Sequence, residues 1–209
     1  MKKKLKHTME KNEICWLNSD SYSKMLEGAR GLLFPKLLDS DHVGILKELI
    51  LAAQPKKMID LGCCSAEVSL LANNFEYVGA DLEDVINNVS KVMHPEISYI
   101  SFNASTSNFK FVEEYDTILM NAFVDVLKDG EHVFENVLSV APSKVILHRQ
   151  CIRKNNELNL LSSPYNGKTY QCVFSISSFK SILAKNNFKI KQQHSWTNDY
   201  FSFLLERES

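Results

Sequence analysis

From residue 57 onward, short apolar runs alternate with segments whose apolar residues recur at helical spacing. The short runs predict strands at Lys57–Leu61, Glu76–Asp81, Ile97–Phe102, Tyr115–Met120 and Lys144–His148. The segments between them predict helices at Ala66–Asn74, Leu82–Met93 and Asp129–Val140. Repeated alternation of strand and helix is typical of a parallel sheet with helices on both faces.

The C-terminal part of the chain breaks this alternation. Ser177–Asn186 is predicted to be a helix, and two strands follow it at Phe188–Ser195 and Tyr200–Leu205. Only Trp196–Asp199 connects these strands, which is too short for a parallel crossover, so they must pair antiparallel. The sequence therefore predicts an α/β fold with a doubly wound, mostly parallel seven-stranded sheet whose last strand is reversed.

The chain is expected to form one domain overall, with two additions before the core. Residues 1–12 are predicted to be a flexible basic tail, residues 13–56 an N-terminal helical cap, and residues 57–209 a Rossmann-like core. Within the cap, Asp41 is predicted to cap a helix that ends before Pro55. The stretch Gln150–Gln171 has no clear periodicity, and a loop of that length is expected to be a lid or a substrate wall.

Composition narrows the class of protein. The 209 residues carry a formal net charge of −1, which gives no reason to expect nucleic acid or an anionic membrane as a partner. No apolar run is long enough to span a bilayer, and none has the form of a secretory signal. The five cysteines are scattered and lack metal-ligand spacing, so we expect reduced thiols, no metal site and a cytoplasmic protein.

The most informative segment follows the first predicted strand. The strand ends at Asp60 and Leu61, and Gly62 and small residues then lead into an apolar segment with helical spacing. Such a turn leaves backbone N–H groups free for a ligand at the start of the next segment. Asp81, at the end of the second strand, lies about 20 residues beyond Gly62, where such folds place an acid for ribose hydroxyls. The two features predict a nucleoside-containing cofactor.

Four segments resemble the motifs of the class I S-adenosylmethionine-dependent methyltransferases, and the resemblance covers residues 41–207. They are Asp60-Leu-Gly62-Cys-Cys64-Ser-Ala66, Tyr77-Val-Gly-Ala-Asp81-Leu82, Ser101-Phe-Asn103-Ala104-Ser105 and Tyr115-Asp-Thr-Ile-Leu-Met-Asn121-Ala-Phe. The reversed C-terminal hairpin is also similar to that of the family. The first motif departs from its acid-x-Gly-x-Gly-x-Gly pattern, because Cys64 and Ala66 replace the later glycines.

The resemblance implies S-adenosylmethionine as the cofactor. It assigns cofactor binding to Asp60, Gly62, Cys64, Ala66, Asp81, Leu82, Asn103, Ala104 and Asn121. In this reading Asp81 holds the ribose hydroxyls, Leu82 stacks on adenine and Asn103 accepts from the adenine amino group. Arg30, Tyr22 and Trp16 would join the site if the cap folds over it, with Arg30 binding the cofactor carboxylate.

Methyl transfer depends mainly on alignment of the acceptor with the methyl group, so a distinctive catalytic set is not required. His148 is the leading candidate for a general base, because it lies at the tip of the fifth strand. Asn121 and Asp125 are further catalytic candidates, and Arg149 could orient an acidic substrate. His194 and Trp196 near the last hairpin could line the acceptor pocket or only pack.

The predicted function is methyl transfer to a small-molecule acceptor at oxygen or nitrogen. One alternative is a degenerate binding module without catalysis, suggested by Cys64 and Ala66. The other is a nucleotide-dependent oxidoreductase, which is disfavoured because Cys64 and Glu67 stand where a Gly-x-Gly-x-x-Gly loop needs glycines. Glu67 would also repel a pyrophosphate, whereas S-adenosylmethionine carries none.

Overall fold

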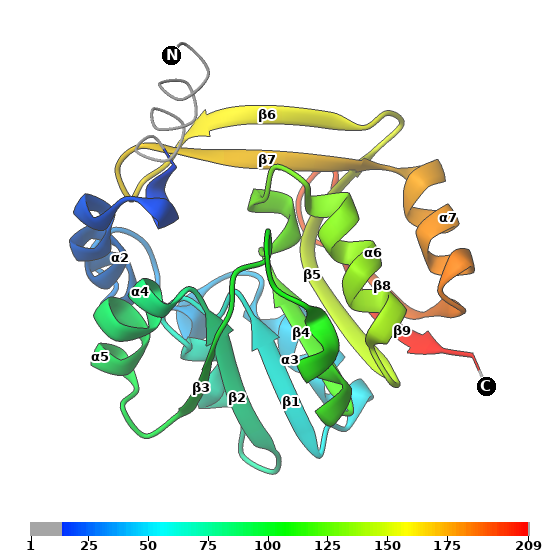
Figure 1. Ribbon diagram of the computed structural model, residues 1–209, viewed down its shortest axis with the longest axis horizontal. Helices are drawn as coiled ribbons and strands as arrows, with labels where there is room; N and C mark the ends of the chain where they lie inside the picture. The colour runs from blue at the N-terminus through cyan, green and yellow to red at the C-terminus, as the bar shows by residue number, and fades with distance from the viewer. Residues whose placement is uncertain (1–13, 209) are drawn as a thin grey trace.

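Five parallel strands form the centre of the sheet in the computed structural model, which describes residues 14–208 (Figure 1). In spatial order they are β3 (Ser98–Ser101), β2 (Glu76–Asp81), β1 (Lys57–Leu61), β4 (Thr117–Asn121) and β5 (Lys144–Arg153). From β1 the chain adds β2 and β3 on one side, and then β4 and β5 on the other. Ligands of such sheets bind at this change of side, beyond the carboxyl ends of the strands. The predicted basic tail at residues 1–12 lies outside the described residues.

The reversed C-terminal hairpin is confirmed. Strand β9 (Tyr200–Arg207) lies between β5 and β8 (Phe188–Ser195) and pairs antiparallel with both. Strand β9 therefore runs against the parallel strands, as the short connection before it requires.

The prediction of a loop over Gln150–Gln171 is wrong, and residues 14–208 form a sheet of nine strands instead of seven. Strand β5 continues to Arg153, and a hairpin of β6 (Glu157–Ser162) and β7 (Lys168–Ser175) follows it. The end of β5 pairs parallel with β7 through Ile152 and Phe174. The hairpin was not predicted because β6 is exposed over most of its length, so its leucines do not mark a buried face.

The helices cover both faces of the sheet, as predicted. They are α2 (Tyr22–Ala29), α3 (Val43–Ala53), a continuous helical segment of α4 (Glu83–Val85), η5 (Ile86–Ser90) and α5 (Lys91–Met93), then α6 (Gly130–Val140) and α7 (Ile176–Lys185). Short 3₁₀ turns complete the chain: η1 (Cys15–Leu17), η2 (Ser19–Ser21), η3 (Leu37–Asp39), η4 (Glu67–Leu71), η6 (Phe109–Glu114) and η7 (Val124–Val126).

Two local predictions differ from the structure. The expected helix Ala66–Asn74 is only the five-residue turn η4, since Ala66 before it has left-handed backbone angles that cannot belong to a helix. His42, and not Asp41, is the residue that precedes α3, and no side chain caps this helix.

Side-chain alternation along the strands builds two cores. Ile59 and Leu61 of β1 face the layer that contains Phe134 of α6, whereas Met58 faces Leu46 of α3. Figure 1 shows α6 in front of the sheet and α3 behind it. Helix α3, which the sequence assigned to the cap, therefore covers one face of the sheet.

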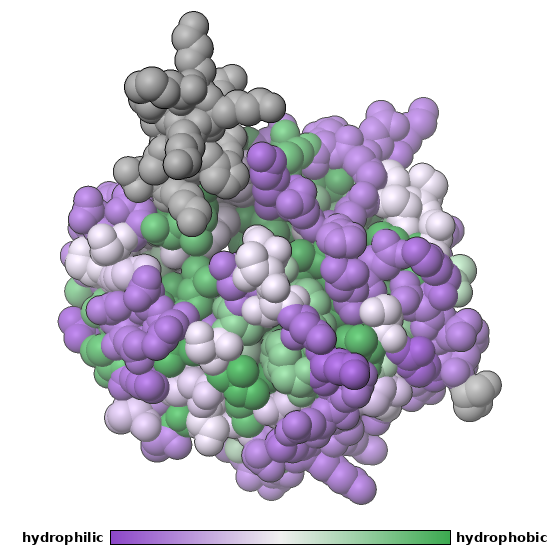
Figure 2. All heavy atoms as spheres, in the orientation of Figure 1, coloured by the Kyte–Doolittle hydropathy of each residue, from purple (hydrophilic) through white to green (hydrophobic). Residues whose placement is uncertain are grey.

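The remaining cap residues form a third cluster beside the sheet, in which Cys15 and Met25 pack against Val85 and Val89. On the face seen in Figure 2, hydrophobic atoms gather in the middle, between the α4–α5 side and the α6 side, with hydrophilic residues around them. No helix in residues 14–208 is long and apolar enough to cross a membrane.

Two leucines of α3 provide a matched test of this packing. Leu46 is fully buried and Leu51 is 76% exposed. We expect Leu46→Ala to lower the free energy of unfolding by about 2–5 kcal/mol, because it leaves a cavity against the sheet. Leu51→Ala should change it by less than about 0.5 kcal/mol. Urea unfolding measures both, and equal losses would mean that α3 does not pack as described.

Candidate functional site

The loop after β1 has the backbone of a glycine-rich turn although it contains one glycine. Gly62, Cys64 and Ala66 have φ angles of 74°, 45° and 57°. Left-handed angles cost an ordinary L-residue roughly 1–2 kcal/mol, so the surrounding structure must hold Cys64 and Ala66 in place. Gly62 and Cys63 donate from their backbone nitrogens to the carbonyl of Ala80 on β2 at 2.8 and 3.2 Å. All three glycine positions of the motif thus have left-handed backbone angles, although only the first is glycine.

Asp81 links this loop to the end of β2. Its Oδ2 accepts from the backbone nitrogen of Cys64 at 2.8 Å, and its Oδ1 accepts from that of Leu82 at 2.7 Å. Burial raises the pKa of Asp81 to about 6, and the two backbone donors oppose that shift. Asp81 forms no ion pair with any described residue, and a carboxylate that accepts two hydrogen bonds retains further acceptor sites. It therefore remains able to accept from a ligand's hydroxyl groups.

The two adjacent cysteines are packing residues, as predicted. Cys63 is buried under Gly79, where its Sγ lies 2.8 Å from the position that a Cβ would take. Cys64 packs in the cap cluster with Cys15 and Leu82. Burial raises the pKa of Cys64 to about 12, which keeps its thiol protonated and unreactive. The cysteines of the described residues are all free thiols.

Asp60 lies beneath the loop and not in the crevice. It is 1% exposed, and its Oδ2 accepts from the hydroxyl of Tyr77 at 2.7 Å. Burial raises its pKa to about 7. A buried carboxyl held in this way supports the strand–loop junction, so direct contact between Asp60 and a ligand is not expected.

The residues after β3 contribute less than the resemblance implies. Asn103 is exposed, and its Oδ1 accepts from the backbone nitrogen of Ser105 at 2.9 Å, which stabilises its own turn. Ala104 and Leu82 are half-buried and offer apolar surface on either side of the β2–β3 tips. Arg30 is exposed at the end of α2, and no hydrogen bond or ion pair among the described residues joins its side chain to the strand tips.

His148 does not have the geometry of a general base. It is 1% exposed, its Nε2 lies 3.0 Å from Nδ1 of His42, and its Nδ1 lies 2.8 Å from Oγ of Ser202. Burial, with the nearby charge of Arg149, lowers the pKa of His148 to about 2 and that of His42 to about 4. With both nitrogens bonded inside the protein, His148 has none to offer an acceptor, so the leading sequence-based candidate is not supported.

Asp125 and Arg149 occupy the space beyond β4 and β5. Asp125, on η7, is 8% exposed, and its Oδ1 has no hydrogen-bond partner among the described residues. Burial raises the pKa of Asp125 to about 7, against the opposing effect of Arg149. Nε of Arg149 donates to Oδ1 of Asn121 at 3.2 Å, at the tip of β4. The structure thus brings together Asn121, Asp125 and Arg149.

Aromatic residues extend this group. The ring of Trp196 lies 5.3 Å from that of His42 and 5.9 Å from the guanidinium of Arg149. His194, by contrast, lies on β8 beside Gln192 and Glu48. Burial raises the pKa of Tyr22, and the nearby charges of Asp84 and Asp81 raise it further. Trp16 is half-buried in the cap cluster.

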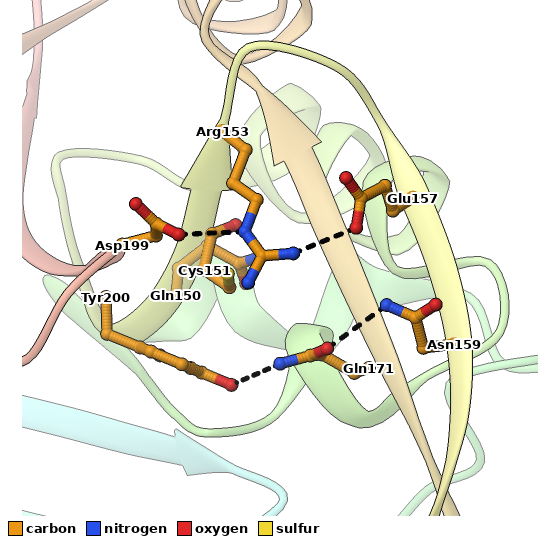
Figure 3. A network of polar contacts seen from close by, with 8 residues as sticks. All are labelled: Gln150, Cys151, Arg153, Glu157, Asn159, Gln171, Asp199 and Tyr200. Atoms are coloured by element: carbon orange, nitrogen blue, oxygen red, sulfur yellow. Dashed lines mark hydrogen bonds and ion pairs between the residues drawn. The ribbon is translucent and has the colours of Figure 1, made fainter.

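The β6–β7 hairpin reaches the cap, as Figure 1 shows. Tyr165, in the turn of this hairpin, packs against the cap cluster, and its ring lies 5.6 Å from that of Phe34. The base of the hairpin is tied to the start of β9: Arg153 pairs with Asp199 at 2.8 Å, and Gln171 donates to the hydroxyl of Tyr200 at 2.7 Å (Figure 3). The hairpin therefore connects the cap with the start of β9.

Tyr165 and His42 were missed from the sequence. Tyr165 lies in a segment without periodicity, and His42 is a single histidine before an apolar helix. Neither position carries a signal that could be recognised without the fold.

The buried histidine pair makes folding sensitive to acid. The unfolded chain binds protons at these histidines near pH 6.5 and the folded chain only near pH 4 or below, so their stabilising contribution is lost as pH falls from 6.5 towards 4. Between pH 7 and pH 5, the free energy of unfolding of His42→Gln should fall by about 2 kcal/mol less than that of the parent. The reason is that the variant lacks one of the two histidines that bind a proton only after unfolding. The raised pKa values of Asp60, Asp81 and Asp125 have the opposite effect, because these carboxyls bind protons more readily in the folded chain. That effect is the same in the parent and in the variant.

The measurement is urea unfolding at both pH values, and His132→Gln, at an exposed position of α6, serves as the control. Equal acid sensitivity of His42→Gln and the parent would mean that the pair is not neutral in the folded protein.

No protein-family model and no curated protein sequence matches the chain. Solved structures do match it. Human N-acetylserotonin methyltransferase in complex with S-adenosylmethionine is similar with a TM-score of 0.63 and 13% identity, over 90% of this chain and 57% of that one. An S-adenosylmethionine-dependent methyltransferase from Mesorhizobium loti is similar with a TM-score of 0.61 and 10% identity, over 82% of this chain and 100% of that one.

Magnesium protoporphyrin IX methyltransferase from Synechocystis with bound S-adenosylhomocysteine gives a TM-score of 0.56 and 16% identity, over 79% of this chain and 82% of that one. Identities this low establish similarity of fold and nothing finer. The strand order, the reversed β9 and these matches together show that the chain has the fold of the class I S-adenosylmethionine-dependent methyltransferases.

Proposed function

We propose that this protein binds S-adenosylmethionine beyond the carboxyl ends of β1 and β2 and transfers its methyl group to oxygen or nitrogen of a small molecule. The observation that carries the proposal is the loop after β1. Its three glycine positions all have left-handed angles, and Asp81 holds it from the next strand with acceptor sites to spare. The methyltransferase fold supports the same function.

The residues present fit the cofactor. Asp81 would accept from the ribose hydroxyls, and Leu82 and Ala104 provide apolar surface for the adenine ring. The loop Gly62–Ala66 would lie along the amino-acid part. Phe123 covers the side of Gly62, where a Cβ would come within 2.4 Å of its ring, so this position requires glycine. The bound cofactor would supply an electrophilic methyl group.

The protein's contribution to the reaction is alignment and acceptance of a proton. Holding the reacting atoms in line can supply most of the rate. Asp125 replaces His148 as the proposed base, because its Oδ1 is unpartnered and its pKa of about 7 suits proton transfer near neutral pH. Asn121 would keep Arg149 in position beside it.

The two alternatives are less well supported. An oxidoreductase would bring a pyrophosphate near Glu67, whose Oε2 is occupied by the backbone nitrogen of Leu37 at 3.0 Å and therefore stays in place. A binding module without catalysis would not need a buried carboxyl such as Asp125, whose Oδ1 has no partner among the described residues and whose pKa is raised to about 7. In this proposal the cap and the β6–β7 hairpin enclose the acceptor site, which favours a small molecule over nucleic acid. The free cysteines are in keeping with a reducing compartment such as the cytoplasm.

Calorimetric titration with S-adenosylhomocysteine tests the binding site. We expect Asp81→Asn to weaken binding about tenfold or more, because charged hydrogen bonds to the ribose are lost. Asp84→Asn, at an exposed position three residues along, should bind as the parent does. Thermal unfolding checks that both variants are folded. An unaltered affinity of Asp81→Asn would place the ribose elsewhere, and no binding by the parent would refute the proposal.

The proposed base is tested by turnover. We expect Asp125→Asn to lower the rate of S-adenosylhomocysteine formation, measured with hydroxyl- and amine-containing acceptors, by about 10²–10⁴-fold without weakening cofactor binding. Asp129→Asn, at an exposed position nearby, is the control and should keep the parental rate. A fully active Asp125→Asn variant would remove Asp125 from the reaction.

A further inference from the structure

The positive charge of Arg149 has no ion-pair partner among the described residues. Its Nε donates to Asn121, and its guanidinium lies over the ring of Trp196. No described residue accepts a hydrogen bond from either Nη group. The side chain is partly accessible, yet enough protein surrounds it that burial lowers its pKa. A guanidinium in such a place normally meets an anion.

The neighbouring acidic groups act on Arg149 without forming an ion pair with it. The charged or titratable side chains that act on Arg149 are Asp125, Tyr165, Tyr200 and Asp41. Asp41 is exposed to solvent, and Asp125 forms no ion pair with Arg149. The field of Arg149 instead reaches His42 and His148, where it helps to lower both pKa values. Within β5, at the irregularity between Leu147 and Gln150, Arg149 therefore carries a positive charge that forms no ion pair with a described residue.

Two unpartnered polar atoms belong to residues near Arg149. The buried side-chain atoms of residues 14–208 that lack a hydrogen bond are Asp60 Oδ1, Asp125 Oδ1, Gln150 Oε1 and Trp196 Nε1. Of these residues, Asp125 and Trp196 lie near Arg149. Buried polar atoms without partners are rare in folded proteins, so two of them near one guanidinium indicate that a ligand binds there.

We infer that the acceptor is a small carboxylic acid whose carboxylate pairs with the Nη groups of Arg149 and whose separate hydroxyl or amine faces Asp125. The inference rests on the proposed methyl transfer and names its substrate class. One guanidinium matches the single charge of a carboxylate in a bidentate pair, whereas no second fixed cation stands among its described neighbours for a phosphate dianion. The rings of Trp196 and Tyr200, 6.0 Å apart, favour an aromatic acid.

The reaction balances on these groups. The acceptor's oxygen or nitrogen forms the new bond to the methyl carbon, while the bond from that carbon to the sulfonium sulfur breaks and leaves its electron pair on sulfur. The proton of the acceptor moves to the carboxylate of Asp125. The acceptor's own carboxylate stays bound to Arg149 and is not methylated.

The experiment compares hydroxy- and aminobenzoic acids with the matching benzamides, which lack the charge. Binding is followed by ligand-observed NMR with and without S-adenosylhomocysteine, and methylation by product mass spectrometry with S-adenosylmethionine. We expect the parent to prefer acids by about tenfold or more and Arg149→Gln to lose that preference. Arg149→Lys, which keeps the charge but not the planar fork, should keep part of it.

Arg153→Gln is the matched control, because Arg153 lies on the same strand and already pairs with Asp199 and Glu157 (Figure 3). It should keep the full preference for acids. The inference is overturned if amides bind as well as acids, if the preference survives Arg149→Gln, or if the product is a methyl ester. Acid binding at Arg149 without S-adenosylhomocysteine binding would instead refute the proposed function and leave a carboxylate site.

Discussion

The structure of the site depends on one carboxylate, that of Asp81. It accepts from the backbone of Cys64 in the loop after β1 and from the backbone of Leu82 at the end of its own strand. Two neighbouring strand ends are thereby held together, and the loop is kept open. Because burial raises the pKa of Asp81 while backbone donors lower it, the group remains a carboxyl with acceptor sites to spare. The proposed position of the ribose follows from this arrangement.

The same hydrogen bonds explain how the loop tolerates the loss of two glycines. Glycine is favoured at such positions because it adopts left-handed angles without strain. Here the hydrogen bonds to Ala80 and Asp81, with the packing of Cys64 and the complete burial of Ala66, hold the strained backbone in place. Only Gly62 lacks room for a side chain, because Phe123 lies against it. A motif defined by glycines can therefore persist as a backbone shape after most of them are replaced.

At the other end of the site, beyond β4, two kinds of polar group lie close together: histidines that are bonded inside the protein, and charged groups that retain polar atoms without partners. His148 is hydrogen-bonded to His42 and to Ser202, and burial lowers the pKa of both histidines, so they are neutral and belong to the protein interior. Asp125 and Arg149 are close enough to affect each other's pKa but do not pair, and each retains polar atoms without partners. Histidine at a strand tip suggested chemistry, yet the groups left free to act are the carboxyl and the guanidinium beside it.

The sequence by itself determined the alternation of strands and helices, the reversed hairpin and the positions of Gly62 and Asp81, because all of these depend on local periodicity and short connections. Only the tertiary structure showed the β6–β7 hairpin, whose exposed strand β6 has no buried face, and the burial of Asp60. It also showed that both ring nitrogens of His148 are occupied inside the protein, whereas Oδ1 of Asp125 has no partner among the described residues. The partners of His148 come from residues 106 and 54 positions away, on α3's N-terminal flank and β9, and no local pattern reveals which side chains long-range packing will occupy.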